Sequence, residues 1–477
     1  MKIALDPASG PMHRQIAEQI RSMILGGDLP PGTGLPSVRA LSEELGTSSL
    51  TVHHAYRHLG DLGLVISSPR RGTRVANRLV GADGMVKLDR LPQEGPVSDF
   101  EHWAESSGVR SMASSVGDPS LFFPEELLAE LEQLRRDSPW NFYYSEPSGA
   151  PPLLTQIARI VSRDVLQTDA SELVVTSGST RAIALLLEVL TEPGDTVLIQ
   201  DPGRLWLTEL LRVKRLVGLP LRSVGAGIDI DHATHCARQY RPKLILLSPD
   251  FGHATGLVMP ETDRLASIRL ASDFGMSIVE DGACTALNFG VRKPPAITLL
   301  DPAISAYVGS FSYSLCPGVR TGFLRIANQL RSRVTAASQA TGVSGSRFLQ
   351  VALARYLSGG AYDAHLKRVL PRYRARRDAM LSALALHMPR PVTWTESRGG
   401  FSTWLTLPPG LSSTDLYSQA LGHGVVFAPG KLFLTSGDSE RYLRLSFGML
   451  EPDAIRESVR ELARLTSQMA TESALGS

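Results

Sequence analysis

The pattern of apolar and polar positions divides the chain into two unlike parts. Near the N-terminus, apolar residues recur three and four positions apart, which is the spacing of one face of a helix. This spacing, bounded by prolines, glycines and N-capping serines, predicts helices over residues 11–26, 37–46 and 48–63. Two β-type stretches, residues 64–67 and 73–76, follow and are joined by a basic turn. The order of helix, short helix, helix and hairpin is typical of a winged helix-turn-helix.

A different pattern begins after residue 110, where short apolar β-type runs alternate with helical segments. The runs are predicted at residues 173–176, 196–200, 244–248, 276–280 and 306–309. This alternation predicts an α/β domain with a mostly parallel sheet covered by helices. Residues 77–110 have scattered glycines and prolines and little periodicity, which is typical of an interdomain linker. We therefore divide the chain into residues 1–76, 77–110 and 111–477.

Composition adds an expectation about compartment and partner. The 477 residues are 43% hydrophobic and 20% charged, which excludes a disordered chain. No apolar run reaches the roughly 20 residues that span a bilayer, and neither a signal peptide nor metal-type cysteine spacing is present. We expect a soluble, cytoplasmic protein without a membrane contact or a metal site. The net charge of +2 comes entirely from residues 1–76, which fits a polyanionic partner.

The third predicted helix carries polar and basic residues on the face opposite its apolar stripe. The first residues of a recognition helix reach base edges, while hydroxyl groups and arginines bind phosphates. The arginines of the basic turn would lie along the DNA backbone or in the minor groove. The residues expected to contact DNA are Ser37, Arg39, Ser48, Ser49, Leu50, Thr51, His53, His54, Arg57, Arg70 and Arg71. The alternative for this part is a small helical module that binds another protein.

These residues also carry a family resemblance. The segment LPSVRALSEELGTSSLTVHHAYRHLGDLGLVISSPRRGTRV resembles the DNA-binding domain of GntR-type bacterial transcription regulators, over nearly all of residues 11–76. The resemblance implies binding to operator DNA. The family frequently has an arginine at the position of Ser49, so the usual base contact is altered in this chain.

The turns after the predicted strands carry motifs in a recognisable order. They are TSGSTRAI, IVEDGAC, YVGSFSYSLCPGVRTGF, GGFSTWL, FAPGKLF and RYLRLSF. Ligands collect at the carboxyl ends of parallel strands, and the N-termini of helices there bind phosphate. Taken together, the motifs resemble fold-type I pyridoxal-phosphate (PLP) aminotransferases, which have a smaller C-terminal α+β part. With the winged helix in front, the whole chain resembles the MocR subgroup of GntR regulators.

The resemblance implies a role for each matching residue. The phosphate of PLP would be held by Ser179, Thr180, Ser310, Ser312 and Arg320. The guanidinium among these groups is expected to be a buried cation paired with the phosphate. Asp281 would pair with the pyridine nitrogen, and His253 would face the cofactor. Tyr144 would reach the phosphate of the neighbouring subunit in a homodimer, and Arg444 would bind the carboxylate of a substrate or effector.

The chain departs from this family where catalysis requires its chemistry. The family has its Schiff-base lysine directly after the second serine of Ser-x-Ser, where this chain has Tyr313. A phenol cannot form that covalent link, and no lysine lies within two residues of Tyr313. Cys284 stands at a tyrosine position of the family, and Arg204 replaces the aromatic residue that would stack on the ring. We expect PLP to bind non-covalently or to be absent.

Three hypotheses follow for the whole chain. In the first, it is a DNA-binding transcription regulator whose degenerate aminotransferase-like domain dimerises and senses PLP or an amino-acid-like effector. In the second, it is an active PLP-dependent aminotransferase with a DNA-binding appendage, which the missing lysine argues against. In the third, the large domain is only a dimer platform. The sequence favours the first and third without separating them.

Overall fold

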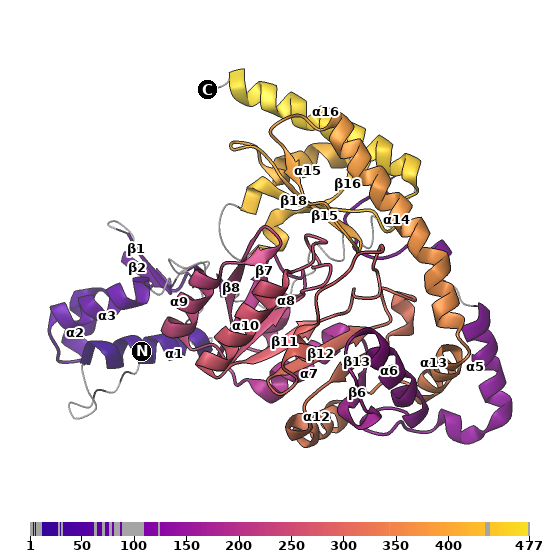
Figure 1. The fold of residues 1–477 in the computed structure, drawn as a ribbon. Helices are drawn as coiled ribbons and strands as arrows, with labels where there is room; N and C mark the ends of the chain where they lie inside the picture. Colours follow the sequence, from indigo (N-terminus) through magenta and orange to yellow (C-terminus); the bar gives the residue numbers. More distant parts are fainter. Residues whose placement is uncertain are drawn as a thin grey trace.

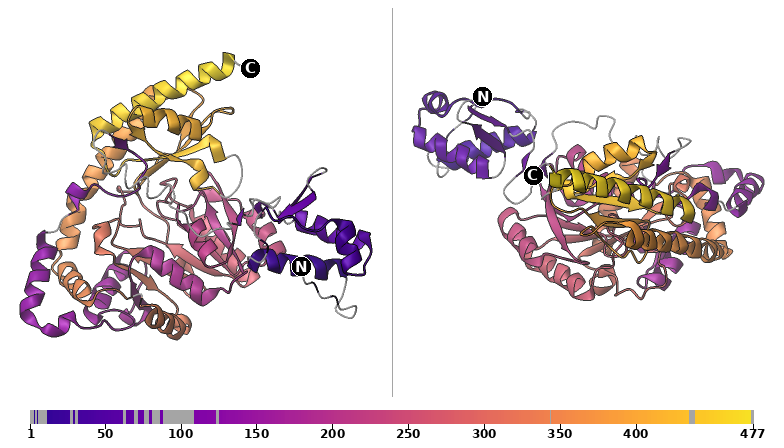
Figure 2. Two further views of the ribbon diagram at one scale, coloured as in Figure 1. Left: turned by 180° about the vertical axis from the view of Figure 1, so that it is seen from behind. Right: turned by 90° about the horizontal axis from the view of Figure 1, so that it is seen from above.

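A computed structural model of the chain shows a small N-terminal head and a large α/β domain (Figure 1). The views from two further sides show the same division (Figure 2). The structure describes residues 3, 5, 12–26, 29, 32–61, 64–68, 72–75, 79–80, 86–87, 109–122, 125–342, 344–434 and 439–475. Within these residues, no helix combines the length and the apolar character needed to cross a bilayer.

The head contains the predicted helices followed by an antiparallel hairpin. Its elements are α1 (Met12–Gly26), α2 (Val38–Glu44), α3 (Ser49–Asp61), β1 (Val65–Ser68) and β2 (Gly72–Val75). The side chain of Ser37 caps α2 by accepting a hydrogen bond from the backbone nitrogen of Ala40 at 3.1 Å, as its N-cap position predicts. The apolar faces of the helices meet in one core around Ile20 and Leu59. The predicted hairpin is confirmed, with strand ends shifted by one residue.

A mostly parallel sheet forms the centre of the large domain. Its strands are β6 (Leu173–Thr176), β7 (Thr196–Asp201), β8 (Val217–Val224), β10 (Leu244–Leu247), β11 (Ser277–Asp281), β12 (Ser305–Ser310) and β13 (Gly322–Arg325). They lie in the order β8-β7-β10-β11-β12-β13-β6, and β13 is antiparallel to both of its neighbours. The consecutive pairs from β8 to β12 are parallel. The carboxyl ends of β11 and β12 therefore lie at the same edge.

Helices cover both faces of this sheet. The helices are α5 (Glu125–Asp137), α6 (Pro151–Asp164), α7 (Ser179–Leu190), α8 (Leu207–Val213), α9 (Ile230–Tyr240), α10 (Glu261–Phe274), α11 (Ile297–Leu300), α12 (Asn328–Thr341) and α13 (Arg347–Ser358). Side chains of α7, α8 and α12 pack on one face, against alternate strand residues such as Val197 and Ile199. The intervening Leu198 faces the opposite layer, where α9 and α10 cover one end of the sheet and α5, α6 and α13 cover the other.

The C-terminal part is the smaller α+β unit that the resemblance implied. Its elements are α14 (Ala361–His387), β14 (Thr393–Trp394), β15 (Ser402–Thr406), α15 (Ser413–Gly422), β16 (Val425–Val426), β17 (Ala428–Pro429), β18 (Tyr442–Ser446) and α16 (Pro452–Leu475). Strands β14, β15, β18 and β17 form one antiparallel sheet. Strand β16 pairs with β5 (Arg110–Ser111), at the start of the large domain.

The predicted linker contains regular structure that the sequence did not indicate. Strands β3 (Leu79–Val80) and β4 (Val86–Lys87) pair with each other, and Val86 pairs with Gly218 at the edge of β8. Strand addition at a sheet edge uses backbone hydrogen bonds, so it needs no periodic side-chain pattern. The short strand β9 (Gly227–Ile228) also pairs with β8.

The 3₁₀ turns are η1 (Pro119–Leu121), η2 (Pro139–Phe142), η3 (Ala170–Glu172), η4 (Pro317–Val319), η5 (Gly430–Leu432) and η6 (Ser439–Arg441).

Candidate functional site

The head presents the exposed face of α3 as its candidate DNA-binding surface. Leu50 is 64% exposed near the first turn, where a recognition helix meets base edges. The hydroxyl of Ser48 accepts a hydrogen bond from the backbone nitrogen of Thr51 at 3.1 Å and so caps the helix. Among the other predicted contact residues of this helix, Ser49, His53 and Arg57 are exposed and His54 is half-buried. On α2, Arg39 forms an exposed ion pair with Glu43. Arg70 and Arg71 lie outside the described residues.

Hydroxyl groups and one guanidinium surround the predicted phosphate position of the large domain. Gly178, with φ 99°, turns the chain from β6 into α7, which begins at the buried Ser179 and the half-buried Thr180. At the end of β12, the Ser310 hydroxyl accepts a hydrogen bond from the backbone nitrogen of Ser312 at 3.1 Å. The buried hydroxyl oxygen of Ser312 itself has no hydrogen-bond partner within the described part of the chain. This is the donor set of an anion cradle at a helix N-terminus.

Arg320 lies at this cradle in an arrangement that differs from the expected one. The sequence predicted a buried cation, but Arg320 is exposed, because it follows the turn η4 at the surface. Its guanidinium lies beside Gly178 and donates a hydrogen bond to the carbonyl of Ser177 at 3.0 Å. No carboxylate among the described residues lies within ion-pair distance of it. Arg320 therefore supplies a positive charge that an anion in the cradle can meet.

Asp281, at the end of β11, is already paired by the protein. The sequence predicted that its carboxylate would meet a pyridine nitrogen. In the structure, the Nε of Arg204 forms a buried ion pair with its Oδ2. Its Oδ1 accepts a hydrogen bond from the backbone of Ala283 at 3.1 Å, and the Ser248 hydroxyl lies 3.4 Å from Oδ2. The expected pairing is therefore not available in this arrangement, because Arg204 reaches the same carboxylate.

Tyr313 and His253 lie next to this ion pair. Nη1 of Arg204 donates to the hydroxyl of Tyr313 at 3.2 Å, and the rings of Tyr313 and His253 are 5.0 Å apart. His253 Nε2 is 3.5 Å from the sulfur of Cys284. Burial raises the pKa of Cys284 to about 12, and burial with the nearby Arg204 and Arg444 cations lowers the pKa of His253 well below its usual value. Near neutral pH, this cluster therefore contains neither a thiolate nor an imidazolium.

Arg444 is a second buried guanidinium near the same tyrosine. It lies on β18, donates a hydrogen bond to the carbonyl of Ala113, and is 4.6 Å from the centre of the Phe433 ring. Its Nε is buried without a partner, and within the described ranges no carboxylate forms an ion pair with it. Burial lowers its pKa to about 10, partly offset by Tyr313. Sequence reasoning found Arg444 but missed Phe433, whose FAPGKLF motif is the signal that could have identified it.

Tyr144 belongs to an exposed aromatic patch that also contains Trp140, Phe142, Tyr143 and Phe348. Tyr144 is 85% exposed, and the other four side chains are also exposed. The patch is held by ring contacts, including 5.5 Å between Trp140 and Tyr143 and 5.7 Å between Phe142 and Phe348. Exposed aromatic side chains that gather in this way are typical of a protein interface. It is consistent with the predicted role of Tyr144 in a dimer.

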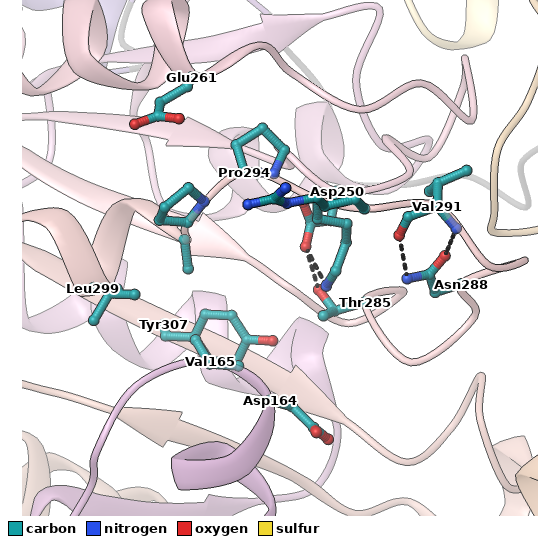
Figure 3. A pocket seen from close by; sticks show the side chains of 14 residues that line it. Asp164, Val165, Asp250, Glu261, Thr285, Asn288, Val291, Pro294, Leu299 and Tyr307 are labelled. Atoms are coloured by element: carbon teal, nitrogen blue, oxygen red, sulfur yellow. Dashed lines mark hydrogen bonds and ion pairs between the residues drawn. The ribbon is translucent and has the colours of Figure 1, made fainter.

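A separate cavity of about 670 Å³ lies beside Asp250, Thr285 and Tyr307 (Figure 3). The carboxylate of Asp250 meets Lys293 at 2.8 Å and Arg264 at 2.6 Å. The Thr285 hydroxyl lies 3.4 Å from the same carboxylate. The described lining has no buried side-chain nitrogen or oxygen without a hydrogen bond. The buried polar side-chain atoms described in the lining of this cavity therefore already have hydrogen-bond partners. Arg204 differs, because its buried Nη2 has no partner among the described residues.

Comparison with known proteins agrees with both parts of the chain. Residues 12–75 match the family of bacterial regulatory proteins, gntR family. The uncharacterized HTH-type transcriptional regulator YdcR of Escherichia coli (strain K12) is 29% identical over 473 residues, which cover 96% of this chain and 99% of YdcR. The chain combines a gntR-family DNA-binding region with an aminotransferase-like domain. Its relatives are MocR-type regulators, and this GntR regulator is accordingly a DNA-binding transcription regulator.

The large domain of this GntR regulator is similar to transaminases. The 2-aminoadipate transaminase of Thermus thermophilus is 30% identical over 379 residues, which cover 78% of this chain and 94% of that enzyme. The crystal structure of LysN, an alpha-aminoadipate aminotransferase from the same organism, aligns with a TM-score of 0.73 and 28% identity. It covers 80% of this chain and 96% of LysN. The predicted fold-type I architecture is therefore confirmed.

Proposed function

We propose that this regulator binds operator DNA as a homodimer in the cytoplasm, and that its large domain senses a small anion without performing transamination. The observation that carries the proposal is the pair of replacements at Tyr313 and Arg204. Tyr313 stands where the resemblance places the lysine of the enzymes, and Arg204 holds the carboxylate of Asp281. Both changes remove a group that the catalytic chemistry of that family needs.

The tyrosine cannot do the work of a lysine. In transaminases, the lysine forms the covalent link to the cofactor and moves a proton at the substrate. Burial raises the pKa of the Tyr313 hydroxyl, although Arg204 beside it acts in the opposite direction. The phenol is therefore protonated at neutral pH and is neither a nucleophile nor a base. The active transaminase remains the alternative, supported by the likeness to the transaminases above.

The two ends of the expected cofactor site fit PLP differently. PLP would supply an electron sink when bound, which requires a carboxylate at its pyridine nitrogen. The phosphate end has the hydroxyl of Ser312 without a partner and the unpaired cation of Arg320, which suit a phosphate group. At the ring end, the carboxylate of Asp281 is already paired with the guanidinium of Arg204. The residues present fit a phosphate group and do not fit the aromatic ring.

The exposed aromatic patch supports the homodimer. Tyr144 has no cofactor-site role within its own subunit, because its side chain points into solvent with 85% exposure. A second subunit that covers the patch would bury these rings and bring Tyr144 to the partner's cradle. Each aromatic side chain that becomes buried contributes roughly 1.5–3 kcal/mol to the association. We propose the large domain as the dimerisation unit.

The proposal is tested with the purified full-length protein and added PLP. We expect no covalent adduct after borohydride reduction, measured by absorbance and intact-protein mass spectrometry. The 2-aminoadipate transaminase, treated in parallel, is the positive control. A protein-bound PLP mass fixed by borohydride would contradict the non-catalytic assignment. If PLP binds reversibly and is lost in Arg320→Ala, a non-covalent phosphate site is supported.

A further inference from the structure

The hydroxyl groups in the first turn of α3 are already engaged within the head. The hydroxyl oxygens of Ser49 and Ser42 are 3.1 Å apart, which ties α3 to α2. The hydroxyl oxygens of Ser48 and Thr51 are 2.8 Å apart, and Ser48 also caps the helix. These contacts hold the turn between the two helices together. The polar side chains that follow along α3 are imidazoles.

His54 contacts imidazoles on both α1 and α3. The centre of its ring lies 6.1 Å from that of His13, in the first turn of α1, and the two ring planes are nearly perpendicular at 84°. The ring of His53 lies 6.3 Å away on the same helix. His13 and His54 are half-buried, and His53 is exposed. Three imidazoles from two helices therefore form one cluster, which sequence reasoning missed because α1 and α3 are far apart along the chain.

The first turn of α1 lies beside the turn that precedes α3. The sulfur of Met12 is 3.8 Å from the hydroxyl oxygen of Thr47. This first turn of α1 carries no acidic residue, and its Arg14 is exposed. The first residues of a recognition helix meet base edges, while the flanking parts of the protein contact phosphates. His13 is therefore placed to meet a phosphate when α3 enters the major groove.

The described acidic side chains of α1 and α2, the two helices packed against α3, interact with other groups. They are Glu18, which pairs with Arg21 at 2.8 Å, Glu43, which pairs with Arg39 at 3.0 Å, and Glu44, whose charge acts on Tyr56. Strand β1, which also packs against α3, has no titratable side chain. On α3 itself, Arg57 and His58 are exposed. No described carboxylate lies within ion-pair distance of the three clustered imidazoles, so the surroundings of the cluster do not neutralise a positive charge on it.

Protonation changes what an imidazole can recognise on DNA. Histidine is the side chain whose ordinary titration falls between pH 5 and pH 8. A neutral imidazole has one N–H donor and one acceptor nitrogen, whereas an imidazolium has two donors and a positive charge. In the major groove, guanine presents only acceptors at N7 and O6, whereas adenine presents an acceptor and a donor. Contacts with guanine and with phosphate therefore favour the protonated ring.

We propose that His13 and His54 form a proton-linked DNA contact, in which His54 donates to a guanine edge and His13 donates to a neighbouring phosphate. The proposal rests on DNA binding by the head, and it adds a residue of α1 to the recognition surface. His13 also positions His54, because its ring packs perpendicular to the His54 ring and limits where that side chain can lie. Because a phosphate favours the charged form of His13, DNA and protons each strengthen the binding of the other.

The experiment measures DNA binding by the full-length protein at pH 6 and pH 8, using fluorescence anisotropy at constant ionic strength. The probe is a duplex from the protein's own upstream region that the wild type retards. We expect binding at least about fivefold tighter at pH 6 than at pH 8, because each proton taken up on binding contributes up to about tenfold per pH unit. His235→Asn, an exposed histidine on α9, is the matched control and should keep the wild-type ratio of the two affinities.

Two variants of His13 separate its charge from its packing. His13→Phe keeps an aromatic ring against His54 but takes up no proton, so the ratio of the affinities at pH 6 and pH 8 should fall by at least about half. His13→Arg carries a fixed charge, so it should bind more tightly than the wild type at pH 8 and also show a smaller ratio. Circular dichroism at both pH values confirms that each variant is folded.

Selection of bound duplexes from a randomised pool at both pH values tests the contact made by His54. For the wild type, we expect a guanine preference at one position of each half-site that is stronger at pH 6 than at pH 8. In His54→Gln this preference should be lost, because the amide pairs with adenine and does not titrate.

Three results would overturn the inference while DNA binding by the head still stands. They are equal wild-type affinities at pH 6 and pH 8, an unchanged ratio in His13→Phe, and a guanine preference that persists in His54→Gln. Failure of the wild type to retard any upstream fragment at either pH would instead reject DNA binding itself, and the inference with it.

Discussion

The side chain of Arg204 determines which groups remain available at the buried end of β11, because it pairs with the carboxylate of Asp281. It meets the carboxylate of Asp281 from a loop after β7, 77 residues earlier in the chain. The sequence singled out both residues, but it did not predict that their side chains would pair with each other. The order of the motifs predicts which strand end carries a residue. The partner of a long side chain depends on which groups the fold brings close to it, and the sequence alone does not show this. Arg320 was misjudged for the same reason, since its burial depends on the turn before it.

The Arg204–Asp281 pair gives a prediction for stability. Asp281→Ala leaves a buried guanidinium without its anion, and we expect the free energy of unfolding to fall by about 3–5 kcal/mol. In the double variant Arg204→Leu/Asp281→Ala, the loss should be smaller than the sum of the two single losses, because no unpaired charge remains. Urea unfolding followed by circular dichroism measures all three. Additive losses would show that the pair does not interact.

His253 gives a prediction for pH dependence. Burial and the two arginines lower its pKa well below 6.5 in the folded state. As the pH falls below about 6.5, the unfolded chain takes up this proton before the folded chain does, so stability decreases. His253→Asn should lose less stability than the wild type between pH 7 and pH 5, by up to about 1.4 kcal/mol per pH unit. In this variant the dependence of the unfolding free energy on pH is reduced but not abolished, because burial also lowers the pKa of His365.

Thermal melts across this range provide the measurement for His253. His58→Asn, an exposed histidine on α3, is the control and should follow the wild-type curve. Equal slopes for His253→Asn and the wild type would reject the assignment.

At the level of elements, sequence patterns located the helices and strands well where apolar spacing was strong. The helix α2 and its Ser37 cap, and the strand β6, were predicted at or within two residues of their ends. The helix α7 begins at Ser179, directly after Gly178, whose positive φ lets the chain turn from the strand into the helix. Strands β3 and β4 were missed, since two-residue edge strands have no periodicity to detect.

The helix α3 and the basic turn give a prediction for DNA binding. The double variant Arg70→Ala/Arg71→Ala should weaken binding to all sequences and lower the salt slope by about 0.9 per lost phosphate contact. His54→Ala should change the preferred sequence instead. Electrophoretic shifts at several salt concentrations, with Arg238→Ala as the control, measure both. Failure of the wild type to retard any fragment of its own upstream region at low salt would contradict operator binding.

At the scale of the whole molecule, the large domain and the aromatic patch predict a homodimer. The double variant Trp140→Ser/Tyr143→Ser removes two exposed rings that a partner would cover. We therefore expect the dissociation constant of the dimer to rise at least tenfold. Sedimentation of the full-length protein measures the change. Val224→Ser, an exposed apolar residue on β8, is the matched control. A fragment of residues 111–477 that sediments as a monomer at micromolar concentration would contradict this assembly.

The separate cores of the head and the large domain have a consequence for how such a protein changes over time. Among the described residues, the head core contains side chains only from residues 3–75, and the other cores begin after residue 108. A substitution that repacks one core therefore leaves the packing of the other untouched. Substitutions can therefore accumulate in the head without repacking the large domain, and the reverse also holds, so that the two parts of the chain can change independently.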